Sequence, residues 1–114
     1  MAADVLGKTI IMIKGDSACF SVDPHYQDGT AYEPQEGDVI RFAMKKHYTD
    51  ETPLLLLNIP TDTMLLEIDP QDTENLEAGK INGRYKYDIE LTRANGWVDT
   101  FISRANFILL EEVH

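Results

Sequence analysis

The residues that could carry out metal or nucleophilic chemistry are few and widely separated in this sequence. His25, His47 and His114 share no ligand spacing such as His-x-x-x-His, so they do not predict a zinc or other transition-metal site. Cys19, the only cysteine, can form neither an internal disulfide nor a cysteine-based zinc site. It lies in a predicted strand, without the turn or helix start that activates a catalytic thiol. We therefore expect loop or surface histidines and a structural thiol.

Acidic residues lie near the ends of several predicted strands, where sandwiches can gather carboxylates into calcium sites. The twelve-residue calcium loop with alternating Asp and Asn ligands and a final Glu is absent. The alternative is that these carboxylates bond backbone NH groups in turns and that Asp72 caps a short helix. The acidic residues concerned are Asp16, Asp38, Asp69, Asp72, Glu74 and Asp88.

Motifs for enzymatic catalysis are missing as well. The sequence contains no phosphate-binding Gly-rich loop and no Gly-x-Ser-x-Gly motif. Paired carboxylates for glycoside cleavage need a cleft, and a small sandwich offers little depth for one. We predict a non-enzymatic protein without catalytic residues, metal or cofactor; a small hydrolase that uses Asp or Glu is the alternative.

Aromatic side chains in predicted loops and turns could bind a ligand. Trp97 directly follows Asn95-Gly96, and Tyr26, Tyr32 and Tyr48 lie in predicted loops. An exposed set of such rings could stack on a sugar or anchor a protein interface. The other interpretation, which we favour for Trp97, is that its ring covers one end of the core.

The elements that must position these residues are strands, and the clearest of them lies within 83–101. Apolar-bearing and charged residues alternate there, as in a strand with one dry and one wet face. Asn95-Gly96 then favours positive φ, which predicts a two-residue type I′ turn and a hairpin at the centre of a sheet. The inward residues of this strand are Tyr85, Tyr87, Ile89 and Leu91.

Further strands are predicted along the whole chain. Residues 9–13 are apolar at odd and even positions alike, so we expect this strand to be covered on both faces or to lie at a crossing between sheets. We also expect it to form a first hairpin with 17–22. Residues 54–59 are also largely apolar at both odd and even positions, that is, on both faces of a strand. This strand is either buried or an edge strand that forms an interface. The candidate interface residues are Leu54, Leu55, Leu56, Leu57 and Ile59.

Only the segment near 70–77 is predicted to be helical. Asp69 precedes Pro70 at the first helical position, and Asp72 lies in the first turn, where the helix dipole favours acids. The sequence therefore predicts an all-β, immunoglobulin-like antiparallel β-sandwich of seven to eight strands with one short helical turn. Tyr85 and Asp72 are the candidates for its structural corner, in which a tyrosine hydroxyl bonds a nearby backbone group; simple packing of Tyr85 is the alternative.

The composition limits the classes of partner. The 114 residues fit a single domain, 1–114, and include ten basic and twenty acidic residues, a formal charge of -10. Such a charge repels nucleic acid and anionic membranes unless the cations cluster, and along the sequence they do not. The longest apolar run, 54–57, is far short of the roughly 20 residues that cross a bilayer. We expect no nucleic-acid partner, no membrane insertion and no signal peptide.

Four different motifs follow one another along nearly the whole chain. They are Lys14-Gly15-Asp16-Ser17, Asp28-Gly29-Thr30-x-Tyr32-x-Pro34-x-Glu36-Gly37-Asp38, Ile68-x-Pro70-x-Asp72-Thr73-x-x-Leu76-x-x-Gly79 and Tyr85-x-Tyr87-Asp88-Ile89-x-Leu91. Together they resemble a family of small proteins encoded in phage and prophage structural-gene regions of Gram-positive bacteria, which is similar to the N-terminal domain of phage baseplate upper proteins. A baseplate upper protein continues into helical and receptor-proximal parts that these residues do not include, so no individual contact residue is carried over.

The resemblance implies a virion component, in the baseplate, the tail or a head decoration. Such a protein is made in the bacterial cytoplasm and assembles through protein contacts, as a homo-oligomer or on other virion proteins. A carbohydrate-binding or adhesive module that binds a glycan through Trp97 and the loop tyrosines is the alternative function.

Overall fold

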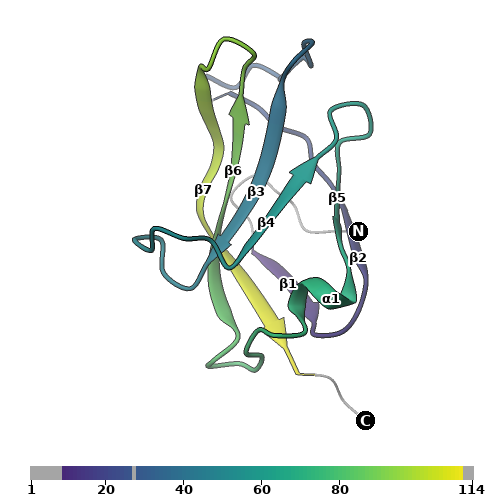
Figure 1. Cartoon of the computed structure of the whole chain (residues 1–114), viewed down its shortest axis with the longest axis vertical. Coiled ribbons are helices and arrows are strands. Elements are labelled where there is room, and N and C mark those ends of the chain that lie inside the picture. The colour runs from purple at the N-terminus through teal and green to yellow at the C-terminus, as the bar shows by residue number, and fades with distance from the viewer. Residues whose placement is uncertain (1–8, 27, 112–114) are drawn as a thin grey trace.

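The computed structural model of the protein describes residues 9–26 and 28–111, which form two β-sheets over one core (Figure 1). The large sheet has the strand order β1-β7-β6-β3-β4 and the small sheet pairs β2 with β5. Within this part of the chain the elements are β1 (Ile10–Ile13), β2 (Ala18–Ser21), β3 (Val39–Lys45), β4 (Leu55–Ile59), β5 (Leu65–Ile68), α1 (Pro70–Thr73), β6 (Arg84–Thr92) and β7 (Val98–Leu110).

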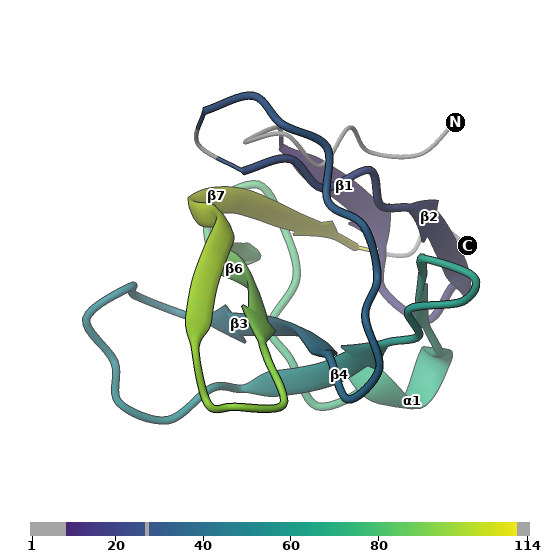
Figure 2. The ribbon, with the colours of Figure 1, turned by 90° about the horizontal axis from the view of Figure 1, so that it is seen from above.

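This arrangement is an immunoglobulin-like β-sandwich, as predicted. The pairs within the two sheets are antiparallel except that of β1 with β7, which is parallel. Viewed from above, the large sheet curls, so that its edge strands β1 and β4 both approach the small sheet (Figure 2). The described residues include no helix that is long and apolar enough to cross a membrane.

The core is built by the predicted alternation of side chains along each strand. Because successive side chains of a strand point to opposite faces, every second residue of β3 and β6 is inward and fully buried. β6 lies between β7 and β3 and is thus the central strand of the large sheet. Its inward side chains, and those of β3, are Tyr85, Tyr87, Ile89, Leu91, Ile40, Phe42 and Met44.

The predicted first hairpin is wrong, because the turn after β1 carries the chain from one sheet to the other. β1 pairs with β7 and β2 pairs with β5. Gly15, with φ of 90°, allows this turn, and its amide donates to the Thr73 hydroxyl at 3.3 Å. The expected cover on both faces of β1 is wrong as well, since Ile10 is buried whereas Ile11 is 57% exposed.

The turn between β6 and β7 also differs from the prediction. Its loop has three residues, 94–96, since the Gly96 amide donates to the Arg93 carbonyl at 2.9 Å and the Arg93 amide to the Trp97 carbonyl at 2.7 Å. Gly96 has positive φ but Asn95 does not. A type I turn followed by a left-handed glycine therefore replaces the two-residue type I′ turn.

The helix α1 and the start of β6 form the structural corner. α1 ends at Thr73, earlier than the predicted limit near residue 77, and Asp72 accepts a hydrogen bond from the Asp69 amide at 2.8 Å. The Tyr85 hydroxyl donates to the Glu77 carbonyl at 2.7 Å, which is the bond that a tyrosine corner requires. The ring of Tyr85 is buried at the same time, so packing and hydrogen bonding act together.

We predict that Tyr85→Phe lowers the free energy of unfolding by about 1 kcal/mol, because it removes the partly buried hydrogen bond to the Glu77 carbonyl while the ring stays packed. Urea denaturation measures this difference. Tyr48→Phe is the matched control, since Tyr48 is an exposed tyrosine in the loop after β3. Equal stability of the two variants would contradict a corner role for Tyr85.

Candidate interaction surface

Two of the tyrosines expected to bind a ligand, Tyr26 and Tyr32, instead belong to a packed aromatic cluster. Their rings contact each other and Phe101 of β7, with centroids 5.3 to 6.2 Å apart. Tyr32 is buried and Tyr26 is half-buried. This cluster closes one end of the sandwich and leaves neither ring free to stack on a sugar.

A polar network holds the aromatic cluster in place. A single oxygen of Asp38, Oδ2, accepts from the Tyr32 hydroxyl at 2.5 Å, the Gln35 amide at 3.0 Å and Arg93 Nη1 at 3.1 Å. The Asp38 side chain is 1% exposed. Arg93 also donates to the Tyr26 hydroxyl, and its guanidinium lies 5.6 Å from the centroid of the Tyr32 ring. The network thus ties the long segment before β3 to the end of β6.

The other two candidate aromatic residues, Trp97 and Tyr48, are exposed but far apart along the sheet. Trp97 is 65% exposed, so our prediction that it covers the core is wrong: the turn carries it past the buried end of β6. Tyr48 lies in the loop after β3, and the guanidinium of Arg104, whose amide bonds Asp88 in the middle of β6, lies 4.3 Å from its ring centroid. The four aromatic residues therefore do not form one platform.

The predicted interface strand β4 is half buried and half exposed. Leu55 and Ile59 point into the core, Leu57 is partly buried, and Leu54 and Leu56 are exposed, Leu56 by 53%. β4 is an edge strand, and within the described part of the chain it pairs only with β3. Two of the five candidate interface residues are thus available on the surface.

A second apolar surface, at the other edge of the large sheet, was missed by the sequence analysis. Ile11 and Ile13 of β1 lie opposite Ile108 and Leu110 of β7 on the outer face. We call these four residues the β1–β7 patch. The sequence feature that indicates this patch is the run of apolar residues at both odd and even positions of 9–13. The sequence analysis interprets that run as burial on both faces.

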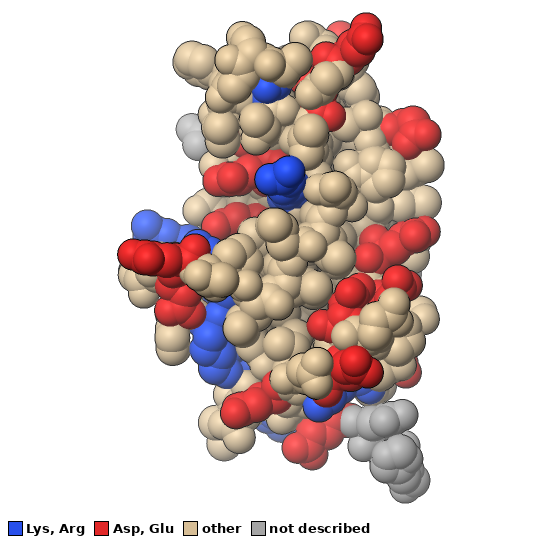
Figure 3. Space-filling model, viewed as in Figure 1, with Lys and Arg blue, Asp and Glu red and all other residues tan. Residues whose placement is uncertain are grey.

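Positive charge gathers on the outer face of the same sheet, although the cations do not cluster in sequence. Lys46, His47, Arg84 and Lys86 line one hollow of about 370 Å³, which we call the basic hollow. Figure 3 shows Lys and Arg side chains along one margin of the molecule, near and below the loop between β3 and β4, whereas many acidic side chains lie along the opposite margin. The pairing of β3 with β6 brings these distant residues together, which spacing alone does not reveal.

The residues weighed for metal or catalytic chemistry lie apart from one another. Among the described residues no three His, Cys, Asp or Glu side chains are placed to hold a metal ion, and His114 falls outside that part. His25 Nδ1 lies 3.0 Å from the Asp23 carbonyl oxygen, and Cys19 is exposed on β2. Asp88 of β6 accepts from the Arg104 amide of β7 at 2.8 Å, where the register of these two strands shifts.

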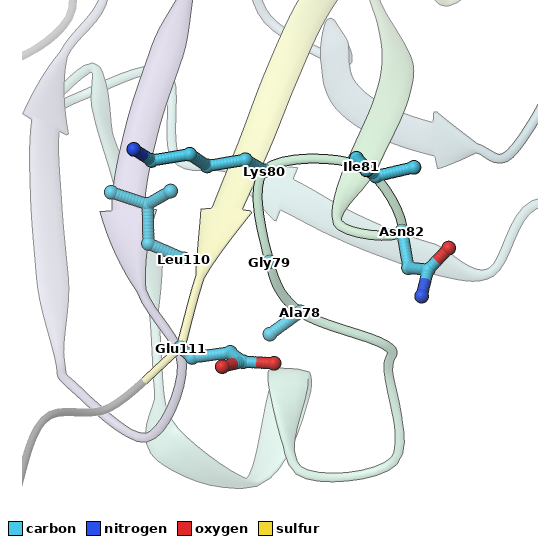
Figure 4. A pocket seen from close by; sticks show the side chains of 7 residues that line it. All are labelled: Ala78, Gly79, Lys80, Ile81, Asn82, Leu110 and Glu111. Carbon is cyan, nitrogen blue, oxygen red and sulfur yellow. The ribbon is translucent and has the colours of Figure 1, made fainter.

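Another hollow, of about 570 Å³, lies beside the loop that precedes β6. In Figure 4 Lys80 and Leu110 lie on one side of this loop, and Ile81 and Asn82 point to the other. Glu111 is the one carboxylate among the described residues that line it. No family model matches this chain, and no curated protein matches it. The fold and its surface define the class: an immunoglobulin-like sandwich with apolar residues at both edges of its large sheet.

Alkaline pH tests the buried tyrosines. Burial and the bond to Asp38 raise the pKa of Tyr32, and burial raises the pKa of Tyr85. Unfolded tyrosines ionise near pH 10, before the folded ones, so their contribution to stability is complete below that pH and is lost as pH rises above it. We predict that Tyr32→Phe makes this decline shallower, measured by urea denaturation between pH 8 and 11. The exposed Tyr48→Phe should keep the wild-type slope; a shallower slope there too would contradict the assignment.

Proposed function

We propose that this protein is a non-enzymatic structural or accessory module of a phage or prophage virion, in the baseplate, the tail or a head decoration. It acts through protein–protein contacts, as a homo-oligomer or on other virion proteins. The observation that carries the proposal is the exposure of apolar side chains on both edge strands of the large sheet, Ile11 on β1 and Leu56 on β4.

Edge strands with exposed apolar residues are suited to association. An edge presents unpaired backbone groups to a partner strand, and soluble monomers rarely leave a large apolar patch in contact with water. A single exposed leucine is ordinary, but in the β1–β7 patch two isoleucines face two further apolar residues across the strands. The resemblance to phage structural proteins names the setting in which such contacts would form.

The other polar groups of the chain support a scaffold rather than a catalyst. The buried carboxylate of Asp38 is held by three donors within a network that joins a loop to the end of β6. Asp72 and Asp88 accept hydrogen bonds from backbone amides. In this proposal the chain is made in the bacterial cytoplasm and enters the virion by assembly.

A carbohydrate-binding or adhesive module is the second candidate, because Trp97 is exposed at the tip of the β6–β7 hairpin. An exposed indole can stack on a sugar ring. Tyr26 and Tyr32 no longer support this function, since their rings are packed against Phe101.

Purified phage particles from a strain that carries the gene test the proposal. We predict that the chain is present in fixed ratio to the major virion proteins, measured by quantitative mass spectrometry. Ile11→Asn and Leu56→Asn together should lower this ratio at least about tenfold, the equivalent of roughly 1.4 kcal/mol of contact energy. Val98→Asn is the matched control, because Val98 is equally apolar and exposed but lies on neither edge strand. Absence of the chain from the particles would refute the proposal.

Fluorescence of Trp97, the only tryptophan, tests the second candidate. We predict no change in its emission when bacterial cell-wall polysaccharides are titrated, because a lone exposed indole without a supporting platform binds sugars poorly. A saturable change that Trp97→Phe abolishes in a direct binding assay would instead favour the carbohydrate-binding function.

A further inference from the structure

The basic hollow collects residues from two neighbouring strands, β6 and β7, and from the loops that follow β3 and precede β6. Lys46 and His47 follow β3, Arg84 and Lys86 belong to the start of β6, and Ile108 belongs to β7. The chain as a whole carries a formal charge of -10. A concentration of cations on so acidic a protein is therefore a local departure from its overall electrostatics.

These cations donate to neutral oxygens of the protein. Lys46 Nζ donates to the Asn82 carbonyl at 2.5 Å, and Arg84 Nε to the Lys80 carbonyl at 2.6 Å. Lys86 Nζ donates to the side-chain oxygen of Asn106. Within residues 9–26 and 28–111 the ion pair is that of Arg93 with Asp38, so no carboxylate of this part lies at ion-pair distance from the cations of the hollow. The Asp50 carboxylate, in the loop after β3, accepts a hydrogen bond from the His47 amide at 3.0 Å at its margin.

The sheet register places a further lysine beside the hollow. Lys45 of β3 and Lys86 of β6 are direct partners in the antiparallel ladder, so their side chains leave the same face of the sheet. Like charges that are directly opposite each other destabilise a sheet. A bound anionic group would remove that repulsion and add attraction.

An apolar wall borders these cations. Ile81, at the tip of the loop 79–83, is 84% exposed, and Ile108 lies beside it in the lining. The loop is fastened to β7, because the Gly79 amide donates to the Leu109 carbonyl at 2.8 Å and the Leu109 amide to the Gly83 carbonyl at 2.7 Å. A Cβ on Gly83 would lie 2.0 Å from the Leu109 oxygen, so glycine is required for this approach. Ile81 is thus presented to solvent by an anchored loop.

We propose that the basic hollow binds an acidic segment of a partner protein, with a carboxylate side chain at Arg84 and Lys86 and an adjacent apolar side chain against Ile81 and Ile108. This inference rests on the proposed function, since it gives the chemistry of one protein partner. Charge complementarity carries it: Lys46, Arg84 and Lys86 lie close together in the hollow, and none of them forms an ion pair with a carboxylate of the described residues.

The same features favour a polypeptide over other occupants. A nucleic acid presents a continuous row of phosphates, which the net charge of -10 repels outside the hollow. A second copy of the chain also has a net charge of -10, so the two copies repel each other outside the hollow. A volume of about 370 Å³ suits one or two side chains, and the apolar wall suits a segment in which acidic and apolar residues alternate.

A peptide titration followed by ¹⁵N NMR of the full chain tests the proposal, with acetyl-Leu-Glu-Leu-Glu-Leu-amide as the probe. We expect amide shifts to centre on Lys46, Arg84, Lys86 and Ile108. Replacing both Glu of the peptide by Gln, or Arg84→Gln or Lys86→Gln in the protein, should each weaken binding about tenfold, the loss expected for one charge-assisted hydrogen bond. Higher salt should weaken it too.

Arg41→Gln is the matched control. Arg41 is also a cation on the outer face of the large sheet, but it bonds Asn58 at 3.3 Å, lies opposite Glu90 and is outside the hollow. We expect its peptide affinity to stay within about twofold of wild type. Lys86→Gln should keep or raise the thermal midpoint, because it relieves the repulsion from Lys45, so that weaker binding is not a loss of folding.

Equal affinity for the Glu and Gln peptides, or shifts centred elsewhere, would overturn the proposal. Tighter binding of a single-stranded oligothymidylate would assign the hollow to nucleic acid, and self-association that Lys86→Gln abolishes would assign it to a second copy; both overturn it. If the chain is found in virions but the peptide does not bind, the inference fails and the proposed function stands. If the peptide binds at the hollow but the chain is absent from virions, the proposed function fails and the binding of an acidic segment stands.

Discussion

The alternation of side chains along β6 is the constraint on which the rest of the structure depends. Tyr85 and Tyr87 must point inward, because both are buried in the core of the sandwich. The centroid of the Tyr87 ring lies 5.2 Å from that of Phe42. The period of two then forces Arg84 and Lys86 to the outer face. A shift of one residue in register would bury two cations and expose two tyrosines, so the core and the basic hollow are specified by the same pattern.

Polar contacts secure the two ends of β6 by different means. At its start the Tyr85 hydroxyl bonds the Glu77 carbonyl, and at its end Arg93 bonds Asp38, which is almost completely buried. Each contact fastens a long connection, the one after α1 and the one before β3, to the central strand. A buried carboxylate without partners would be costly, but here three donors satisfy one oxygen, so the charge is accommodated. Tyr26 and Tyr32, which the sequence analysis considers as ligand contacts, therefore stabilise the fold.

Local patterns predicted the fold class, the inward face of β6, the helix at Pro70 and the residue of the tyrosine corner, because alternation and capping depend on neighbours in sequence. They did not predict which strands pair. β1 joins β7 although nearly a hundred residues separate them, so the exposure of Ile11 could not be inferred from 9–13 alone. The same limit applies to the basic hollow, since Lys46 and Arg84 meet only through the pairing of β3 with β6. Trp97 was misplaced because the turn has one residue more than Asn-Gly suggests.

The curvature of the large sheet bears on how the proposed contacts could be arranged. β1 and β4 are the two edges of the large sheet, and the ribbon seen from above places these strands on opposite sides of the molecule (Figure 2). One flat partner surface could therefore cover the β1–β7 patch or Leu56, but not both. If both edges bind, they bind different neighbours or different surfaces of one neighbour. Such heterologous contacts build rings or successive layers rather than an isolated two-fold dimer, and this is the geometry that a repeated virion component needs.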